Sequence, residues 1–320
     1  MSSKRFGASI VLGVLACCFA VVPAAHAAVL GYWRHEEGAP GSLIPAGNDT
    51  VLDSSGNANH MQTFNPAFTS ATYTSTVSPL SLKSGLPNTR SLDFGPGGDD
   101  AGLNDDNFTT GSKPISSHVF TGMTIELAFK MDTVAGYQAV FGKDGKPLGN
   151  SPGEDNSPVP PIKFLIRGDD FPNAVPSQLF VEFIDGDATL NSDTHFVASG
   201  QTTDPNQWYH VAFTLTASTA ELWVATETTP YTLLDSVTGD FAGPGGAVLA
   251  TDPLGFSSGR GMFNNNVADW ADAHIDEIRI SDTALAPSSF LFNAIPEPTC
   301  LALLPLALLV ARRRTARRAR

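Results

Sequence analysis

The sequence predicts an all-β protein built as a sandwich of two antiparallel sheets. Short segments with alternating apolar and polar residues recur along the chain, turn residues separate them, and no long amphipathic helix or internal repeat is evident. The clearest segment is residues 206–224. Residues 208–216 place Tyr209, Val211, Phe213 and Leu215 on one face, and a second strand follows at residues 221–226. This hairpin has one strongly apolar face, which needs a facing sheet to bury it.

The other predicted strands lie on both sides of this hairpin. Before it, alternating patterns predict strands at residues 29–36, 90–94, 123–131, 137–141, 162–167 and 178–184. After it follow strands at residues 231–237, 255–257 and 274–280, and a short helical turn at residues 287–292. Residues 62–90, 97–107 and 142–161 are predicted to be mostly loop. Since no linker interrupts residues 28–295, we expect a single domain there.

The N-terminal 27 residues have the pattern of a secretory signal peptide. Two basic residues precede an apolar run at residues 10–22, and the small residues Ala25 and Ala27 follow it. We therefore expect cleavage after Ala27 and export across the inner membrane.

The C-terminal 25 residues combine the motif Pro-Glu-Pro at residues 296–298, an apolar run at residues 299–311 and a cluster of arginines that begins at residue 312. As a helix the run would be roughly 20 Å long, short of the ~30 Å bilayer core. The order of parts resembles the PEP-CTERM sorting signal. The resemblance implies a Gram-negative-type bacterium in which exosortase, a membrane enzyme, processes a temporary anchor before the protein reaches the cell surface or matrix. The residues that match the signal are Pro296, Glu297, Pro298, Arg312, Arg313 and Arg314.

Between these two ends the chain is strongly acidic. Residues 28–295 hold 11 Lys and Arg against 31 Asp and Glu, a net charge of −20, and contain no cysteine. Such a charge opposes binding to nucleic acid or to an anionic membrane surface. It suits an extracellular domain or one that holds cations, and without disulfides stability must come from a packed core.

Three stretches, taken in order, resemble laminin-G-like, concanavalin A-like jelly-roll domains. They are D-S-S-G-N-A-N at residues 53–59, W-Y-H-V-A at residues 208–212, and I-D-E-I-R-I at residues 275–280. Each is weak alone, but the ordered set spans nearly the whole body. The return strand departs from the family, because residues 222–226 read L-W-V-A-T where L-Y-V-D-G is common.

A structural calcium ion is the cofactor that this resemblance suggests. Asp53, Asn57 and Asn59 crowd one loop, and in the family such a loop can lie beside the strand that here carries Asp276. Calcium takes oxygen ligands of these types. The alternative is an Asx-rich turn whose side chains satisfy their own backbone, and the sequence leaves both open.

No catalytic residues are predicted. Glycosidases need two carboxyl groups about 5 Å or about 6.5–9.5 Å apart. Glu182 and Asp185 should face opposite sides of a strand, Asp187 follows in a turn, and the adjacent Asp276 and Glu277 should diverge. Residues 28–295 also lack a cysteine nucleophile and a metalloprotease motif.

Sugar binding would require an exposed aromatic side chain beside polar groups. Trp270 is the first candidate, together with Asn264, Asn265 and Asn266, and Trp223 is the second. Either tryptophan could instead be a core or rim residue.

We therefore expect an exported, surface-associated, non-catalytic protein that binds polysaccharide or a matrix partner. The alternatives are a polysaccharide-acting glycosidase or lyase of the same fold and a purely structural matrix protein. The fold accommodates all three. An enzyme needs a carboxylate pair in a cleft, and a binding protein needs an exposed aromatic ring with converging polar groups.

Overall fold

The computed structural model describes residues 27–63, 71–95, 108–144, 160–167, 175, 177–187, 194–250, 254–263 and 266–293. Two antiparallel sheets dominate these residues, and the helical elements among them are short 3-10 turns. The predicted fold class is therefore confirmed. The turns are η1 (Pro114–Ser117), η3 (Pro244–Gly246) and η4 (Pro287–Ser289).

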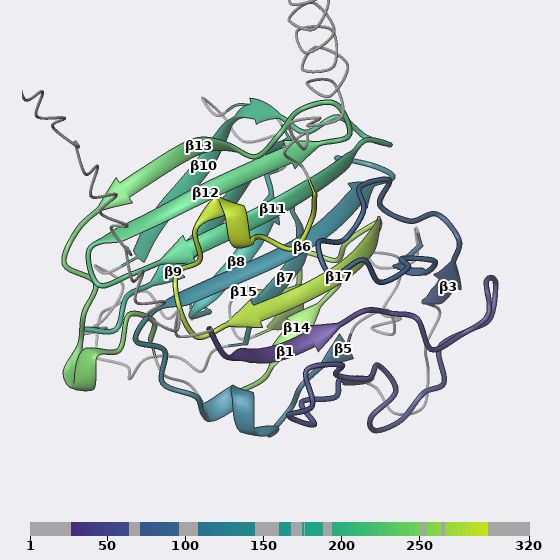
Figure 1. Cartoon of the computed structure of the whole chain (residues 1–320), viewed down its shortest axis with the longest axis horizontal. Helices are drawn as coiled ribbons and strands as arrows, with labels where there is room; N and C mark the ends of the chain where they lie inside the picture. Colours follow the sequence, from purple (N-terminus) through teal and green to yellow (C-terminus); the bar gives the residue numbers. More distant parts are fainter. Residues whose placement is uncertain are drawn as a thin grey trace, which may run out of the picture.

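The first sheet has the strand order β13-β12-β11-β6-β17-β4-β3, and β1 also pairs with β17. Figure 1 shows its long strands side by side. The predicted hairpin is confirmed as β11 and β12, and β11 also pairs with β6. The strands are β1 (Val29–Trp33), β3 (Thr72–Thr74), β4 (Ser91–Asp93), β6 (Met123–Met131), β11 (Trp208–Leu215), β12 (Thr219–Thr226), β13 (Thr232–Thr238) and β17 (Ala273–Ser281).

The second sheet has the order β10-β9-β8-β7-β14-β5-β2 and packs behind the first in the view of Figure 1. A separate pair, β15 (Gly261–Phe263) and β16 (Asn266–Ala268), precedes β17. The strands of the second sheet are β2 (Gln62–Thr63), β5 (Phe108–Thr109), β7 (Gln138–Lys143), β8 (Ile162–Ile166), β9 (Gln178–Ile184), β10 (Thr194–Thr202) and β14 (Phe256–Ser258).

Aromatic side chains fill the space between the sheets. Phe213 of β11 is fully buried, and its ring meets Phe164 edge-on with centroids 6.0 Å apart and Phe183 at 5.6 Å. Phe141 stacks on Phe256 in the same core. The apolar face predicted for β11 is therefore the face that the second sheet buries.

The outer face of the first sheet is buried as well, which the sequence did not predict. Trp208 and Ala212 of β11 belong to a second apolar cluster, which Leu82 and Phe292 help to cover. A bridge pairs Leu82 with Phe292, so two loop segments close over the sheet together. Since both faces of this sheet are covered, its central strands tolerate few exposed polar side chains.

Several short strands lie where the sequence predicted loop or nothing. Residues 62–90 contain β2 and β3, and β5, β10, β15 and β16 were not predicted. Two- and three-residue strands have no readable period. In β10, Gly200 adopts a φ of 66° and the register shifts before Thr202, so the alternation breaks there. The predicted loop at residues 97–107 lies outside the described residues.

Candidate functional site

A pocket of about 170 Å³ lies between the two sheets, where β9 and β10 face β11, β12 and β13. Its wall combines one aromatic ring, aliphatic side chains and many hydroxyl groups. The lining residues are Leu179, Ser199, Gln201, Thr202, Thr203, Tyr209, Val224, Thr226, Thr229, Thr232 and Leu234.

Tyr209 is the aromatic residue of the pocket. It stands near the start of β11 on the core-facing side, and its ring stacks on Phe129 with centroids 5.6 Å apart and planes 22° apart. Its hydroxyl accepts a hydrogen bond from Asp204 N at 2.7 Å and donates one to Gln207 Oε1 at 3.3 Å. Burial raises the pKa of this phenol, so the ring is neutral at physiological pH. The stack and both hydrogen bonds hold the ring in one orientation.

The hydroxyl groups come from the turn after β12 and from β10. Thr226 and Thr229 lie 2.7 Å apart, hydroxyl to hydroxyl, and the turn between them is closed by a backbone bond from Thr226 N to Thr229 O. Ser199 Oγ donates to Gln201 O at 2.9 Å. Because turn and strand geometry fix these oxygens, the pocket has ordered polar groups as well as the aliphatic side chains of Leu179, Val224 and Leu234.

Neither Trp223 nor Trp270, the two aromatic residues predicted to bind sugar, lines this pocket. Trp223 lies half-buried in β12 on the outer face, donates Nε1–H to Glu221 and meets Phe290 edge-on. Trp270 is half-buried just before β17, and two strands separate β12 from β17. Asn266 begins β16, while Asn264 and Asn265 lie outside the described residues. The two tryptophans therefore belong to different parts of the fold.

The loop of Asp53, Asn57 and Asn59 binds its own backbone and that of β1. Asp53 accepts N–H bonds from Tyr32, Ser55 and Asn59 and an O–H bond from Ser55, all at 2.8–2.9 Å. Asn57 and Asn59 each donate to Leu30 O. Both oxygens of Asp53 therefore already have donors, as in the Asx-rich turn that the sequence left open.

Asp276 is fully buried on the outer face and has a different environment. Its Oδ2 accepts bonds from Ser78 N and from Asn88 Nδ2, whereas Oδ1 has no partner, and Asn88 Oδ1 is buried without a partner too. Burial, with the nearby Glu277 carboxylate, raises the pKa of Asp276 well above its usual range. Such a carboxyl favours uptake of a proton or a cation. In the described part of the chain no hydrogen bond joins Asp276 to Asp53.

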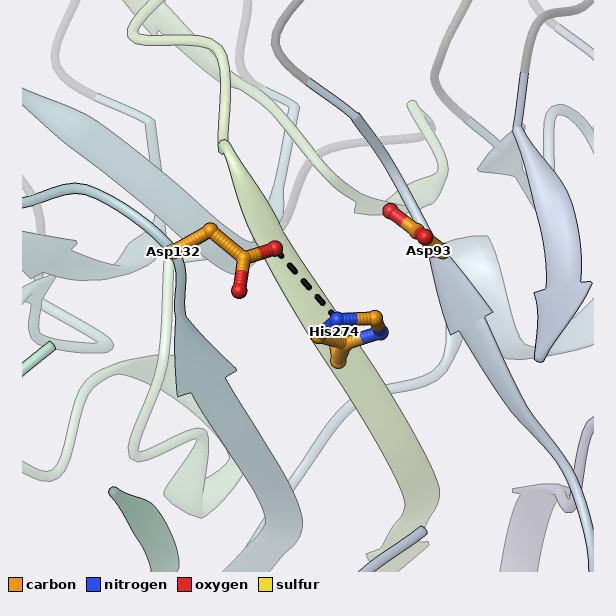
Figure 2. Close-up of side chains that lie close together, drawn as sticks. All are labelled: Asp93, Asp132 and His274. Carbon is orange, nitrogen blue, oxygen red and sulfur yellow. Dashed lines mark ion pairs between the residues drawn. The ribbon is translucent and has the colours of Figure 1, made fainter. Parts of the chain in front are cut away.

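A third group, which the sequence did not predict, consists of Asp93, Asp132 and His274. One ligand atom from each lies within 4.8 Å of the others, and His274 Nε2 lies 3.4 Å from Asp132 Oδ2. Figure 2 shows the imidazole of β17 between the carboxylate at the end of β4 and the one just after β6. Burial lowers the pKa of His274, which keeps the ring neutral. Two carboxylates and one imidazole could hold a divalent ion such as zinc.

Four of the carboxylates considered for catalysis, Glu182, Asp185, Asp276 and Glu277, are engaged in ion pairs or hydrogen bonds. Glu182 pairs with Lys163 at 3.0 Å, and Asp185 pairs with His195 at 2.9 Å. The side chains of Asp276 and Glu277 were predicted to point to opposite faces of the strand, and the structure differs. A β-bulge, in which Glu277 has a φ of 50°, leaves both outside the core while the isoleucines on either side point inward. Both side chains are nevertheless fully buried, so they do not form an open catalytic pair.

Ala28 is the residue that follows the predicted cleavage position. Ala28 N donates to Asp282 Oδ1 at 2.9 Å, and Asp282 N donates back to Ala28 O at 3.1 Å. Ala25 and the matched residues of the C-terminal signal lie outside the described residues. Among the residues that are described, no helix is long and apolar enough to cross a membrane.

Residues 100–289 match the family model of the concanavalin A-like lectin/glucanases superfamily, of the laminin-G type. The chain belongs to this superfamily. The resemblance read from the three sequence stretches is thereby confirmed. No curated protein matches the chain.

Three solved structures are similar over much of the chain. Domain 4 of an extracellular arabinanase from Geobacillus stearothermophilus, in complex with arabinotriose, is 14% identical over 82% of this chain and 96% of its own, with a TM-score of 0.49. The binding domain of botulinum neurotoxin DC in complex with SialylT is 8% identical over 82% and 49%, with a TM-score of 0.45. The carbohydrate-binding module of a Ruminococcus gnavus sialidase, bound to sialyllactose, is 11% identical over 52% and 79%, with a TM-score of 0.38. The matched region spans about half of the neurotoxin chain.

Proposed function

We propose that the protein binds carbohydrate without catalysing a reaction on it, and that the pocket beside Tyr209 is its binding site. The observation that carries the proposal is one immobilised aromatic ring that lines the same pocket between the sheets as many hydroxyl groups. Sugar rings combine apolar C–H faces with hydroxyl groups, and such a pocket offers a surface for each. The lectins in the superfamily's description agree with this function.

The same description also includes glucanases, and the composition of the pocket favours binding over hydrolysis. Glycoside hydrolysis uses a pair of carboxyl groups beside the scissile bond. Among the described residues that line the pocket, none is Asp or Glu. A purely structural matrix protein, the remaining alternative, would not need the pocket.

We propose export and C-terminal sorting as the route to the cell surface or matrix. The leader pattern and the resemblance of the tail to the PEP-CTERM signal, with exosortase as processing partner, motivate this route. The contacts of Ala28 support it at residue level. Cleavage after Ala27 would convert Ala28 N to an ammonium group beside the Asp282 carboxylate, so the new terminus would gain an ion pair.

We also propose one structural calcium ion, held at Asp276 and Asn88. Both side chains have a buried oxygen without a partner, which suits an oxygen-binding cation. Asp53, Asn57 and Asn59 fit less well, because donors occupy both oxygens of Asp53 and the amide groups of the asparagines bind backbone.

A polysaccharide screen with the purified full chain tests the carbohydrate-binding proposal. Binding to immobilised glycans is measured alongside the release of reducing ends. Binding without release, weakened by Tyr209→Ala, is the expected result. Release of reducing ends would establish an enzyme instead. Binding to no glycan would favour the remaining alternative, a purely structural matrix protein.

A further inference from the structure

We infer that the pocket beside Tyr209 takes a single neutral sugar residue and rejects sugars that carry a carboxylate or a sulfate. This inference rests on the proposed carbohydrate-binding function and adds the chemical class of the ligand.

The residues that the structure describes in the pocket wall carry no formal charge. Of its eleven lining residues, Tyr209 alone has an ionisable side chain, and burial keeps that phenol protonated by raising its pKa. An anionic sugar entering such a wall would lose water without gaining an opposite charge, which is costly.

The surrounding chain supplies acidic groups but no basic ones. Residues 168–259, which include the whole lining, contain twelve Asp and Glu and no Lys or Arg. Arg260, which follows this stretch directly, is buried and pairs with Asp144 at 2.7 Å. Two further cations, one on the neighbouring strand β6 and one just before the stretch, also point away from the pocket. Lys130 follows the core-facing Phe129 and lies 3.5 Å from Asp132, and Arg167 stacks over Phe180 on the outer face of the second sheet. The electrostatic environment of the pocket is therefore neutral to negative.

The hydrogen-bonding groups of the wall also suit hydroxyl ligands. Ser199 and Thr232 donate their hydroxyl hydrogens to Gln201 O and Pro230 O, so toward a ligand these two hydroxyl groups can act only as acceptors. Ser199 Oγ also accepts a bond from Gln201 N at 3.3 Å, which leaves it one lone pair. A sugar hydroxyl can donate to such acceptors, whereas an ionised carboxylate or sulfate can only accept. The side-chain amide of Gln201 can pair with a hydroxyl in either direction.

The size of the pocket limits how much of a glycan it holds. About 170 Å³ is below the ~300–1,000 Å³ of pockets for drug-sized ligands. A single ring of a chain, or its terminal residue, is the unit that such a volume suits.

The test uses the full chain and glycan pairs that share a backbone and differ in charge. Methyl-esterified and de-esterified polygalacturonan, galactan and sulfated galactan, and lactose and sialyllactose are suitable pairs. Dissociation constants are measured at about 0.15 and 0.5 M salt, because screening removes long-range repulsion but not the chemistry of the pocket. We expect binding to at least one neutral member, with its acidic partner bound at least about tenfold more weakly at both salt concentrations.

Variants locate the effect. Tyr209→Ala should weaken neutral binding at least about tenfold, while Tyr209→Phe keeps the ring and should stay within about threefold. Thr229→Lys adds a cation at the exposed rim and should bring the acidic partner to within about threefold of the neutral one. Ser236→Lys, an exposed change on β13 outside the lining, adds the same charge and should leave the ratio unchanged. Melting curves confirm that each variant folds.

Each contrary result has a separate meaning. Two results would overturn the preference for neutral sugars while carbohydrate binding stands. One is preferential binding of acidic glycans through Tyr209, and the other is binding of acidic glycans as tight as that of their neutral partners at high salt. Neutral binding unaffected by Tyr209→Ala, together with an acidic-to-neutral affinity ratio unaffected by Thr229→Lys, would overturn the assignment to this pocket. Binding of no glycan would overturn both the inference and the proposed function.

Discussion

Acidification from pH 7 to pH 5 should destabilise the protein through two buried histidines. His35 is fully buried, neither ring nitrogen has a partner, and burial, with Arg34 beside it, lowers its pKa to about 3. Burial also lowers the pKa of His210 to about 4. Unfolded histidine titrates near 6.5. A folded pKa below the unfolded one means that the unfolded chain takes up protons first, so the stability present above about pH 6.5 is lost as pH falls.

The magnitude follows from these values. Between pH 7 and pH 5 an unfolded histidine becomes almost fully protonated while the folded one stays neutral, which costs about 2 kcal/mol per residue. Because both folded values lie below 5, the loss depends mainly on the unfolded pKa. Buried carboxyls act in the opposite direction. Burial raises the pKa of Glu37 and Glu126, and such groups add stability as pH falls.

Urea unfolding at pH 7, 6 and 5 therefore compares the wild-type chain with His35→Gln and His210→Gln. Each variant should lose about 2 kcal/mol less than wild type between pH 7 and pH 5, whatever its absolute stability. His118→Gln, at a half-exposed position after η1, provides the comparison for a histidine outside the core. If both buried variants keep the wild-type pH dependence, the reasoning from burial is wrong.

Three further predictions concern the cation, the processing and the core. Calcium at about 100 times its dissociation constant should add roughly 2.7 kcal/mol and raise the melting temperature by several degrees. Asp276→Asn should remove that difference. Identical melting curves in calcium, in magnesium at equal ionic strength and in chelator would exclude the calcium site. A calcium effect that survives Asp276→Asn but not Asp132→Asn would place the ion in the cluster of Figure 2 instead. Intact mass spectrometry of protein from its native host should find a chain that begins at Ala28 and lacks residues 312–320, and a mature chain that keeps that arginine cluster would contradict processing. Phe213→Ala should lower the free energy of unfolding in urea by about 3–5 kcal/mol. Phe196 is half-exposed on β10, so Phe196→Ala should lower it far less, and equal losses would contradict the assigned core.

The sequence predicts the long strands well because their period is set by burial. Residues 123–131 and the start of the hairpin at Trp208 agree with the bounds of β6 and β11. The bulge at Asp276 and Glu277 breaks that period, because Ile275 and Ile278 both face the core although they stand three residues apart. A strict alternation assigned to residues 274–280 therefore places one of these carboxylates on the wrong face. Segments distant in the sequence bury His210 and the outer face of the first sheet, and no local sequence pattern encodes those contacts.

The candidate site is less predictable than the fold. Tyr209 is assigned to the apolar face from sequence alone, but its place in a pocket depends on β9, β10 and β13, which lie far apart in the chain or carry weak patterns. The strongest single-residue signals for sugar binding, Trp223 and Trp270, come from residues that do not line the pocket. Asp93, Asp132 and His274 come together only through the order of β4, β17 and β6. A run rich in threonine without any Lys or Arg is the signal that could have drawn attention to the pocket.

Methyl NMR is the most direct test of the claim that this pocket binds carbohydrate. The full chain, labelled at Leu, Val and Thr methyl groups, is titrated with a neutral oligosaccharide selected in the glycan screen. We expect shifts concentrated at Leu179, Val224, Thr226, Thr229 and Leu234, which line the pocket. Shifts that spare these methyls and appear instead at other parts of the sandwich would contradict the account.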